Sequence, residues 1–190
     1  MSLKDQLKDQ LQADLKTAML NKDAVRRDVI RFTQAALKNV EMTKNQKLVE
    51  ERVHLWRTGE VDANGDPIIN MPERDKQLAE IAKLTPLTDA EQLAVLATEV
   101  KRRRDTIAEL EKVNRPDLLK HEQDQLEVLL AYLPKQMDRG EIEAVVKQVI
   151  AELGVSGPQA TGAVMGKLMP QLKGKADGKL INEVVRDLLK

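Results

Sequence analysis

Lysines and glycines gather in one short segment near the end of the chain, LKGKADGKL at residues 172–180. Asp177 stands just before the residues at which the last helix is expected to begin. Because helix N-termini present free backbone amides and a partial positive charge, Lys173, Lys175 and Lys179 are suited to bind a phosphate there. The alternative is a solvated turn in which Asp177 caps the helix. Short basic loops are common on protein surfaces, so the residues alone favour the turn.

The run KRRR at residues 101–104 is the sharpest charge feature of the chain. Successive helical residues lie about 100° apart, so the four cations cannot share one face, and Arg104 falls almost on the apolar stripe. Glu122 falls close to the stripe of the following helix. Either charge alone would be costly to bury, so we expect a structural ion pair between Arg104 and Glu122. A functional pocket is the alternative, but ion pairs far outnumber active sites.

Residues typical of catalytic and metal sites are sparse. The chain has no cysteine, and its serines, Ser2 and Ser156, lie in no nucleophile-elbow context. The two histidines are far apart, and no spacing of His, Asp or Glu resembles a metal site. There is no P-loop and no dinucleotide fingerprint. We therefore expect no catalytic residue, no metal and no cofactor, and an enzyme acting alone is disfavoured.

The composition favours helices. Aromatic residues make up 2% of the chain and charged residues 33%, whereas strands are enriched in aromatic and β-branched residues. A formal net charge of zero argues against a protein that coats nucleic acid with its whole surface, but it allows a local basic patch. The first turn is charged and no apolar run approaches bilayer length, which predicts a soluble, cytoplasmic protein with no membrane partner.

Helical periodicity predicts an all-α N-terminal domain over residues 1–134. Helices are expected over residues 3–19, from residue 23 towards Trp56 with Phe32 on the apolar side, and over residues 73–84. Asn-Gly and Asp-Pro turn signals in the segment 58–72 predict a loop that can hold a small hairpin.

A long antiparallel helical hairpin is expected at the end of this domain. Thr88 and Glu91 have capping-box spacing and open a helix to about residue 113. Pro116 suits the first turn of a second helix, and the connection is short, so the two should pack antiparallel. Pro134 stops that second helix just after Tyr132, and we interpret this point as a hinge between two domains.

Residues 135–190 are expected to form a small three-helix domain. Its helices are predicted to begin after Asp138, at Pro158 and after Asp177, and Pro170 is expected to end the middle one. In the middle helix, Gly162 and Gly166 lie four residues apart and would let another backbone approach closely.

Three motifs, YLPKQ, MGKLM and GKADGK, occur in that order and spacing in the second half of the chain. With the sequence around them, they resemble the GatB/YqeY family, and the whole layout is similar to a free-standing YqeY-type protein. The resemblance covers roughly residues 3–42 and 87–190. Residues from about 44 to 85 depart from the usual short connection and are interpreted as an insert.

The resemblance implies a helical N-terminal domain and a three-helix tail. A similar region forms the tail of the B subunit of the amidotransferase that converts Glu-tRNA(Gln) to Gln-tRNA(Gln), and it is appended to some glutaminyl-tRNA synthetases. In those settings the tail is thought to contact tRNA, and the chemistry is done elsewhere. The resemblance thus implies a non-catalytic tRNA-contacting module, in which Lys167, Lys173, Lys175 and Lys179 meet on one face and touch the tRNA backbone.

Two other functions stay open. The chain could be a protein-interaction module whose Tyr132, Pro134, Gly162 and Gly166 dock an aminoacyl-tRNA synthetase or an amidotransferase subunit. It could also be a component of a carbon-nitrogen ligase with glutamine as amido-N-donor, which would require partner subunits. Salt separates the first two functions, because phosphate contacts weaken steeply with salt and an apolar docking face barely responds.

Overall fold

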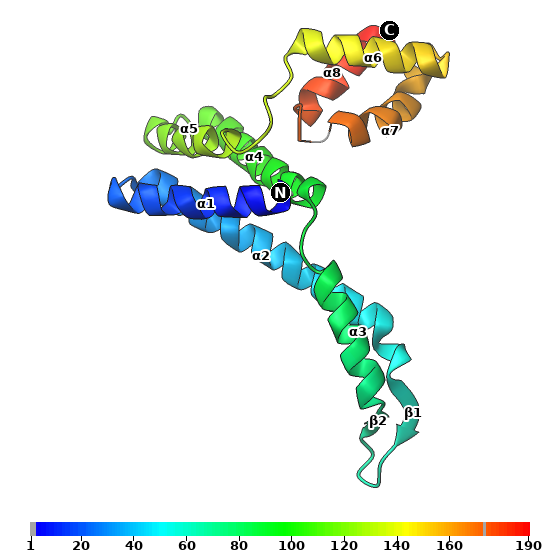
Figure 1. The fold of residues 1–190 in the computed structure, drawn as a ribbon. Coiled ribbons are helices and arrows are strands. Elements are labelled where there is room, and N and C mark those ends of the chain that lie inside the picture. The colour runs from blue at the N-terminus through cyan, green and yellow to red at the C-terminus, as the bar shows by residue number, and fades with distance from the viewer. Residues whose placement is uncertain (1–2, 173) are drawn as a thin grey trace. The chain divides into compact units, whose positions relative to one another are not determined.

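The computed structural model describes residues 3–172 and 174–190 of the chain. Within these residues the fold is all-α, as predicted, with eight α-helices and one small two-stranded ribbon (Figure 1). The chain divides into two compact units, Met1–Val95 and Leu96–Lys190, and the boundary falls inside one helix. The division predicted at Pro134 separates different residues and stays a prediction.

Two long helices begin the first unit. Helix α1 (Leu3–Leu20) packs against α2 (Ala24–Arg52), and the Asp23 side chain caps α2 by accepting from the backbone N–H of Arg26 at 2.9 Å. The interface is apolar, with Leu11, Ala18, Val29, Ile30 and Leu37 almost fully buried. Phe32 is 65% exposed, so its expected place on the buried side of α2 is wrong. The apolar stripe of α2 turns away from Phe32 towards Ile30 and Leu37.

A ribbon extends from the end of α2. A 3₁₀ turn, η1 (Val53–Leu55), leads into strands β1 (Arg57–Val61) and β2 (Pro67–Ile69), which pair antiparallel, and α3 (Met71–Leu84) then returns along α2 (Figure 1). The small hairpin allowed by the turn signals is therefore present. Both strands are exposed along their whole length.

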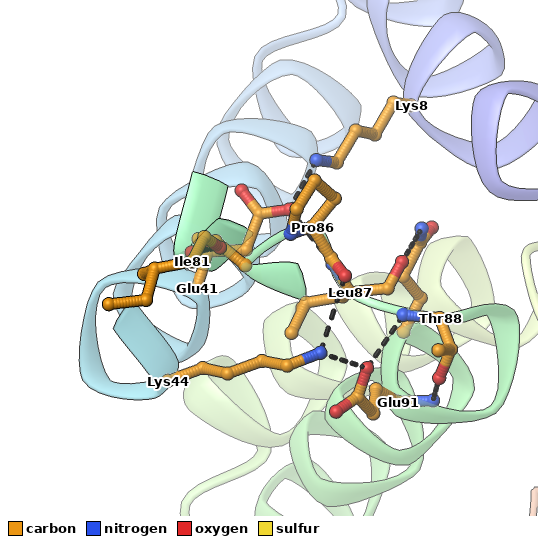
Figure 2. A network of polar contacts seen from close by, with 10 residues as sticks. Lys8, Glu41, Lys44, Ile81, Pro86, Leu87, Thr88 and Glu91 are labelled. Atoms are coloured by element: carbon orange, nitrogen blue, oxygen red, sulfur yellow. Dashed lines mark hydrogen bonds and ion pairs between the residues drawn. The ribbon is translucent and has the colours of Figure 1, made fainter. Parts of the chain in front are cut away.

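A network of polar contacts ties the segment after α3 to the long helices (Figure 2). Glu41 accepts from Lys8 at 2.5 Å and from the backbone N–H of Leu87 at 3.2 Å. Lys44 donates to Glu91 at 2.9 Å and to a nearby backbone carbonyl. The capping box is confirmed, because the Glu91 carboxylate accepts from the Thr88 N–H and the Thr88 hydroxyl accepts from the Glu91 N–H.

The hairpin helices are α4 (Asp89–Lys112) and α5 (Pro116–Leu130). Pro116 occupies the first turn of α5, as the sequence predicts. The side chains of Arg103 and Glu122, at comparable distances from the intervening turn, join the two helices at 2.8 Å.

Three further helices share a core of their own. Helix α6 (Arg139–Leu153) begins with the capping box of Asp138 and Glu141. It is followed by η2 (Pro158–Ala160), α7 (Thr161–Leu172) and α8 (Gly178–Leu188). Pro170 lies inside α7 rather than at its end, because a proline in the last turn removes only one N–H donor. The core consists of Ile142, Val146, Val149, Ala160, Val164, Leu168, Leu172, Ile181, Val184, Val185 and Leu189.

Candidate nucleic-acid interface

Asp177 closes the N-terminus of α8. Its Oδ1 accepts from the backbone N–H groups of Lys179 at 2.7 Å and Leu180 at 3.3 Å. This confirms that Asp177 caps the helix, and it means that these two amides are already bonded. A phosphate bound here would therefore be held by lysine side chains rather than by the helix terminus.

The other oxygen of Asp177 is also used. Oδ2 forms an ion pair with Arg104 of α4, and both side chains are about one-third exposed. One residue further along α4, Asp105 accepts from the ammonium group of Lys179 at 2.8 Å. This hydrogen bond raises the pKa of Lys179 and lowers that of Asp105. Two ion pairs thus join α4 to the start of α8.

The expected ion pair between Arg104 and Glu122 is wrong by one residue. Glu122 pairs with Arg103, whereas Arg104 pairs with Asp177. Arg104 is half-buried, as its place near the apolar stripe indicated. Neighbouring positions on a helix differ by about 100°, but an arginine side chain is long enough to reach across that difference. The charge that compensates Arg104 lies 73 residues away in sequence, where the helical wheel of the hairpin could not find it.

The remaining lysines of the predicted interface have different surroundings. Lys167 of α7 forms an ion pair with Glu152 of α6 at 2.7 Å. Lys175 is exposed and has no side-chain partner among the residues that the structure describes. Lys173 lies outside the described residues. That these lysines share one face with Lys179 stays a prediction.

The loop before α8 is tied down by residues that follow α5. The backbone N–H of Met137 donates to the carbonyl of Lys175 at 2.7 Å, and the side chain of Gln136 donates to the carbonyl of Gly174 at 2.9 Å. Gly174 has φ 78°, a left-handed conformation that suits glycine. These bonds hold Lys175 on a defined turn. Sequence reasoning missed Gln136 and Met137, although both belong to the segment YLPKQM that drew attention to the hinge.

The predicted docking residues divide into buried and open ones. Tyr132 is only 7% exposed and contributes to the core, whereas Pro134 is exposed. Gly162 and Gly166 are exposed on α7, and a Cβ added at either position would meet nothing within 4 Å. No backbone in the described part of the chain approaches this pair of glycines.

Two further surveys cover the described residues. Among them, no three His, Asp or Glu side chains gather in a way that could hold a metal ion. None of the helices in this part of the chain is both long enough and apolar enough to span a bilayer.

The family model described as "Yqey-like protein" matches residues 8–56 and 60–189. The chain belongs to the YqeY-like family. The match runs through most of the region from about residue 44 to 85, with a break at residues 57–59 in β1.

Curated relatives fall into two kinds. A glutamyl-tRNA(Gln) amidotransferase subunit of Methanococcus vannielii is 44% identical over 59 residues, which are 29% of this chain and 9% of that protein. The subunit of the same name from Methanocaldococcus jannaschii is 42% identical over 60 residues, 30% of this chain and 10% of that protein. The YqeY-like chain thus matches only about a tenth of the length of these subunits.

A relative similar along most of its length is "Altered inheritance of mitochondria protein 41, mitochondrial" of Pyrenophora tritici-repentis. It is 26% identical over 159 residues, which cover 82% of this chain and 78% of that protein. The YqeY-like layout therefore also occurs in a protein of similar extent, outside the large amidotransferase subunits.

Proposed function

We propose that this YqeY-like protein is an accessory module, without catalytic machinery of its own, that contacts the phosphate backbone of tRNA. The observation that carries the proposal is the stretch of about 60 residues shared with amidotransferase subunits whose name specifies a tRNA-linked glutamyl group. A segment shared between a large tRNA-dependent enzyme and a small chain is best explained by a binding role, because the small chain holds so little of the enzyme.

The lysines around the start of α8 are the proposed contact. Lys175 projects from a turn that backbone hydrogen bonds hold in place, so little order is lost when it binds. The ammonium group of Lys179 is three-quarters exposed in spite of its ion pair. Lysines recognise phosphate as point charges and carry no base readout, so this contact adds affinity without sequence specificity.

The size of the contact follows from the charge balance. The whole chain has no net charge, so nucleic acid would be attracted to a local patch and not to the surface at large. Each phosphate contact adds about 0.7 to 0.9 to the slope of log affinity against log salt. Loss of three contacting lysines should therefore lower that slope by about 2 to 3.

The test is binding of total tRNA at several salt concentrations, for the wild-type chain and for a variant with Lys173, Lys175 and Lys179 changed to alanine. The wild-type dissociation constant should be of micromolar order and should rise with salt, and the variant should bind far more weakly with a smaller slope. The matched control changes the exposed Lys16, Lys38 and Lys47 of the first unit, which alters the net charge equally. Equal losses in both variants, or no binding at all, would contradict the proposal.

A second candidate function is docking to an aminoacyl-tRNA synthetase or to an amidotransferase subunit. The open face at Gly162 and Gly166 favours it, because small residues let a partner helix approach closely. The substitutions Gly162→Leu and Gly166→Leu have room in the isolated chain, so they should block docking without unfolding α7. Tyr132 is buried and takes no part in such a surface.

Two further expectations stay predictions. Activity as a component of a carbon-nitrogen ligase with glutamine as donor would need partner subunits. A cytoplasmic location is not decided either, since the fungal relative is named as a mitochondrial protein.

A further inference from the structure

The two ion pairs between α4 and the start of α8 have opposite orders of charge. Arg104 and Asp105 are successive residues of α4, cation first, whereas Asp177 precedes Lys179 in the tail, anion first. Arg104 binds Asp177 and Asp105 binds Lys179, so each element supplies one cation and one anion. A tail lysine assigned to RNA is thus already held by a carboxylate of the same chain.

The two pairs differ in shelter. The side chains of Arg104 and Asp177 are 32% and 29% exposed, whereas those of Lys179 and Asp105 are 75% and 47% exposed. Exposed ion pairs contribute little to stability and are readily replaced, while sheltered ones are harder to break. The sheltered pair therefore keeps α4 beside the loop, and the exposed pair can be exchanged for another anion.

We propose that Asp105 is an intramolecular competitor of RNA phosphate for Lys179, so that an RNA backbone must displace this carboxylate from the tail. This inference rests on the proposed function, because it concerns the same lysine. A carboxylate oxygen at 2.8 Å from the Lys179 ammonium group is the same kind of ligand as a phosphate oxygen. The carboxylate sits on the same chain, so it competes at a high effective concentration.

The chain has the means to release the contact. Residues 131–138, between α5 and α6, contain no helix, so α4 and the tail can separate there without breaking a helix. The three tail helices have their own apolar core and do not need α4 to fill it. RNA that binds Lys179 would therefore shift the protein from a state in which α4 holds the tail to one in which it does not.

The decisive variant is Asp105→Asn, which removes the competing charge and leaves Lys179 intact. The matched control is Asp124→Asn on α5, because Asp124 also forms an ion pair with a lysine, Lys120, and its loss changes the net charge equally. Binding is measured with two probes, total tRNA and inorganic polyphosphate, which carries phosphates but no bases. Thermal unfolding checks that each variant is folded.

Asp105→Asn should tighten binding of both probes roughly two- to fivefold, as expected for release of an exposed ion pair. Asp124→Asn should have a smaller effect. In a Lys179→Ala background, Asp105→Asn should lose its effect, because the lysine for which it competes is gone.

The outcomes separate the two proposals. If the wild type binds no tRNA but Asp105→Asn tightens polyphosphate binding, the competition stands and the tRNA function fails. If both Asp→Asn variants tighten binding equally, only net charge matters and the competition is overturned. It is likewise overturned if Asp105→Asn has no effect on either probe, or if its effect persists without Lys179.

Discussion

Two clusters of charged side chains in this molecule use the same residue types in opposite ways. Around Leu87 in the first unit, the carboxylates of Glu41 and Glu91 accept from backbone N–H groups as well as from lysines (Figure 2). At the start of α8, Lys179 and Asp105 bind only each other's side chains and remain largely exposed. A cluster that satisfies backbone groups fixes the fold, whereas exposed side-chain pairs can be exchanged for a ligand.

The physical reason lies in what is left behind when a partner is removed. If Glu41 is lost, the N–H of the buried Leu87 loses its acceptor, and an unsatisfied buried donor is costly. If Asp105 is lost, Lys179 is simply hydrated. Charge alone therefore does not identify a binding surface; the test is whether the charged groups also hold the backbone.

The largest effect is expected from the apolar centre of the first cluster. Leu87 is 1% exposed, so Leu87→Ala should lower the free energy of unfolding by about 2 to 5 kcal/mol through lost burial and the cavity left behind. Urea denaturation followed by circular dichroism measures it. Leu118, which is 43% exposed on α5, is the matched control, and Leu118→Ala should change little. Equal effects would mean that the segment around Leu87 is not a fixed part of the fold.

A smaller effect is expected at the capping box. Glu91→Ala removes the acceptor for the Thr88 N–H and the partner of Lys44, and should cost about 1 kcal/mol of stability. Glu91→Gln keeps an acceptor for the N–H and loses only the charge, so it should cost less. If Gln and Ala are equally destabilising, the ion pair matters more than the cap, and the contrast drawn between the two clusters is wrong.

Local signals allowed the helix boundaries to be predicted from the sequence. The capping spacings at Thr88 and Asp138 mark the starts of α4 and α6, and Gly154 ends α6 in a left-handed conformation. These signals act within one turn of helix, so a single sequence contains all of the information needed. Asp177 belongs to the same class, and its capping role was foreseen as the simpler of two interpretations.

Long-range pairing could not be predicted in the same way. The sequence indicated that Arg104 needs an anion, but several carboxylates were available, and the correct one depends on how the tail packs. The exposure of Phe32 has a similar cause, since it depends on which side of α2 meets α1. The same limit applied to the candidate site: the lysines were visible as a motif, whereas the carboxylate that holds Lys179 lies 74 residues away.

The two clusters should also differ in their response to acid. Burial acts to raise the pKa of Glu41, but hydrogen bonds from Lys8 and the Leu87 N–H outweigh it, so the pKa lies below its ordinary value. A carboxylate with a lowered folded pKa contributes stability above its unfolded pKa of about 4.3, and that contribution is lost as the pH falls through the folded pKa. Unfolding measured between pH 7 and 3 should show this loss, and Glu41→Gln should make it shallower. An unchanged profile would show that Glu41 does not titrate with folding.

The smallest effect on stability is expected where the effect on binding is largest. Lys179→Ala removes a pair that is mostly exposed, so its thermal unfolding midpoint should match that of the wild type while its affinity for tRNA falls. Lys44→Ala is the counterpart in the first cluster: it leaves the half-buried Glu91 without its cation and should lower the midpoint without changing tRNA affinity. Differential scanning fluorimetry and the binding assay measure both variants side by side. If Lys179→Ala unfolds earlier than Lys44→Ala, the start of α8 is a structural cluster like that around Leu87, and its lysines are not held in reserve for a ligand.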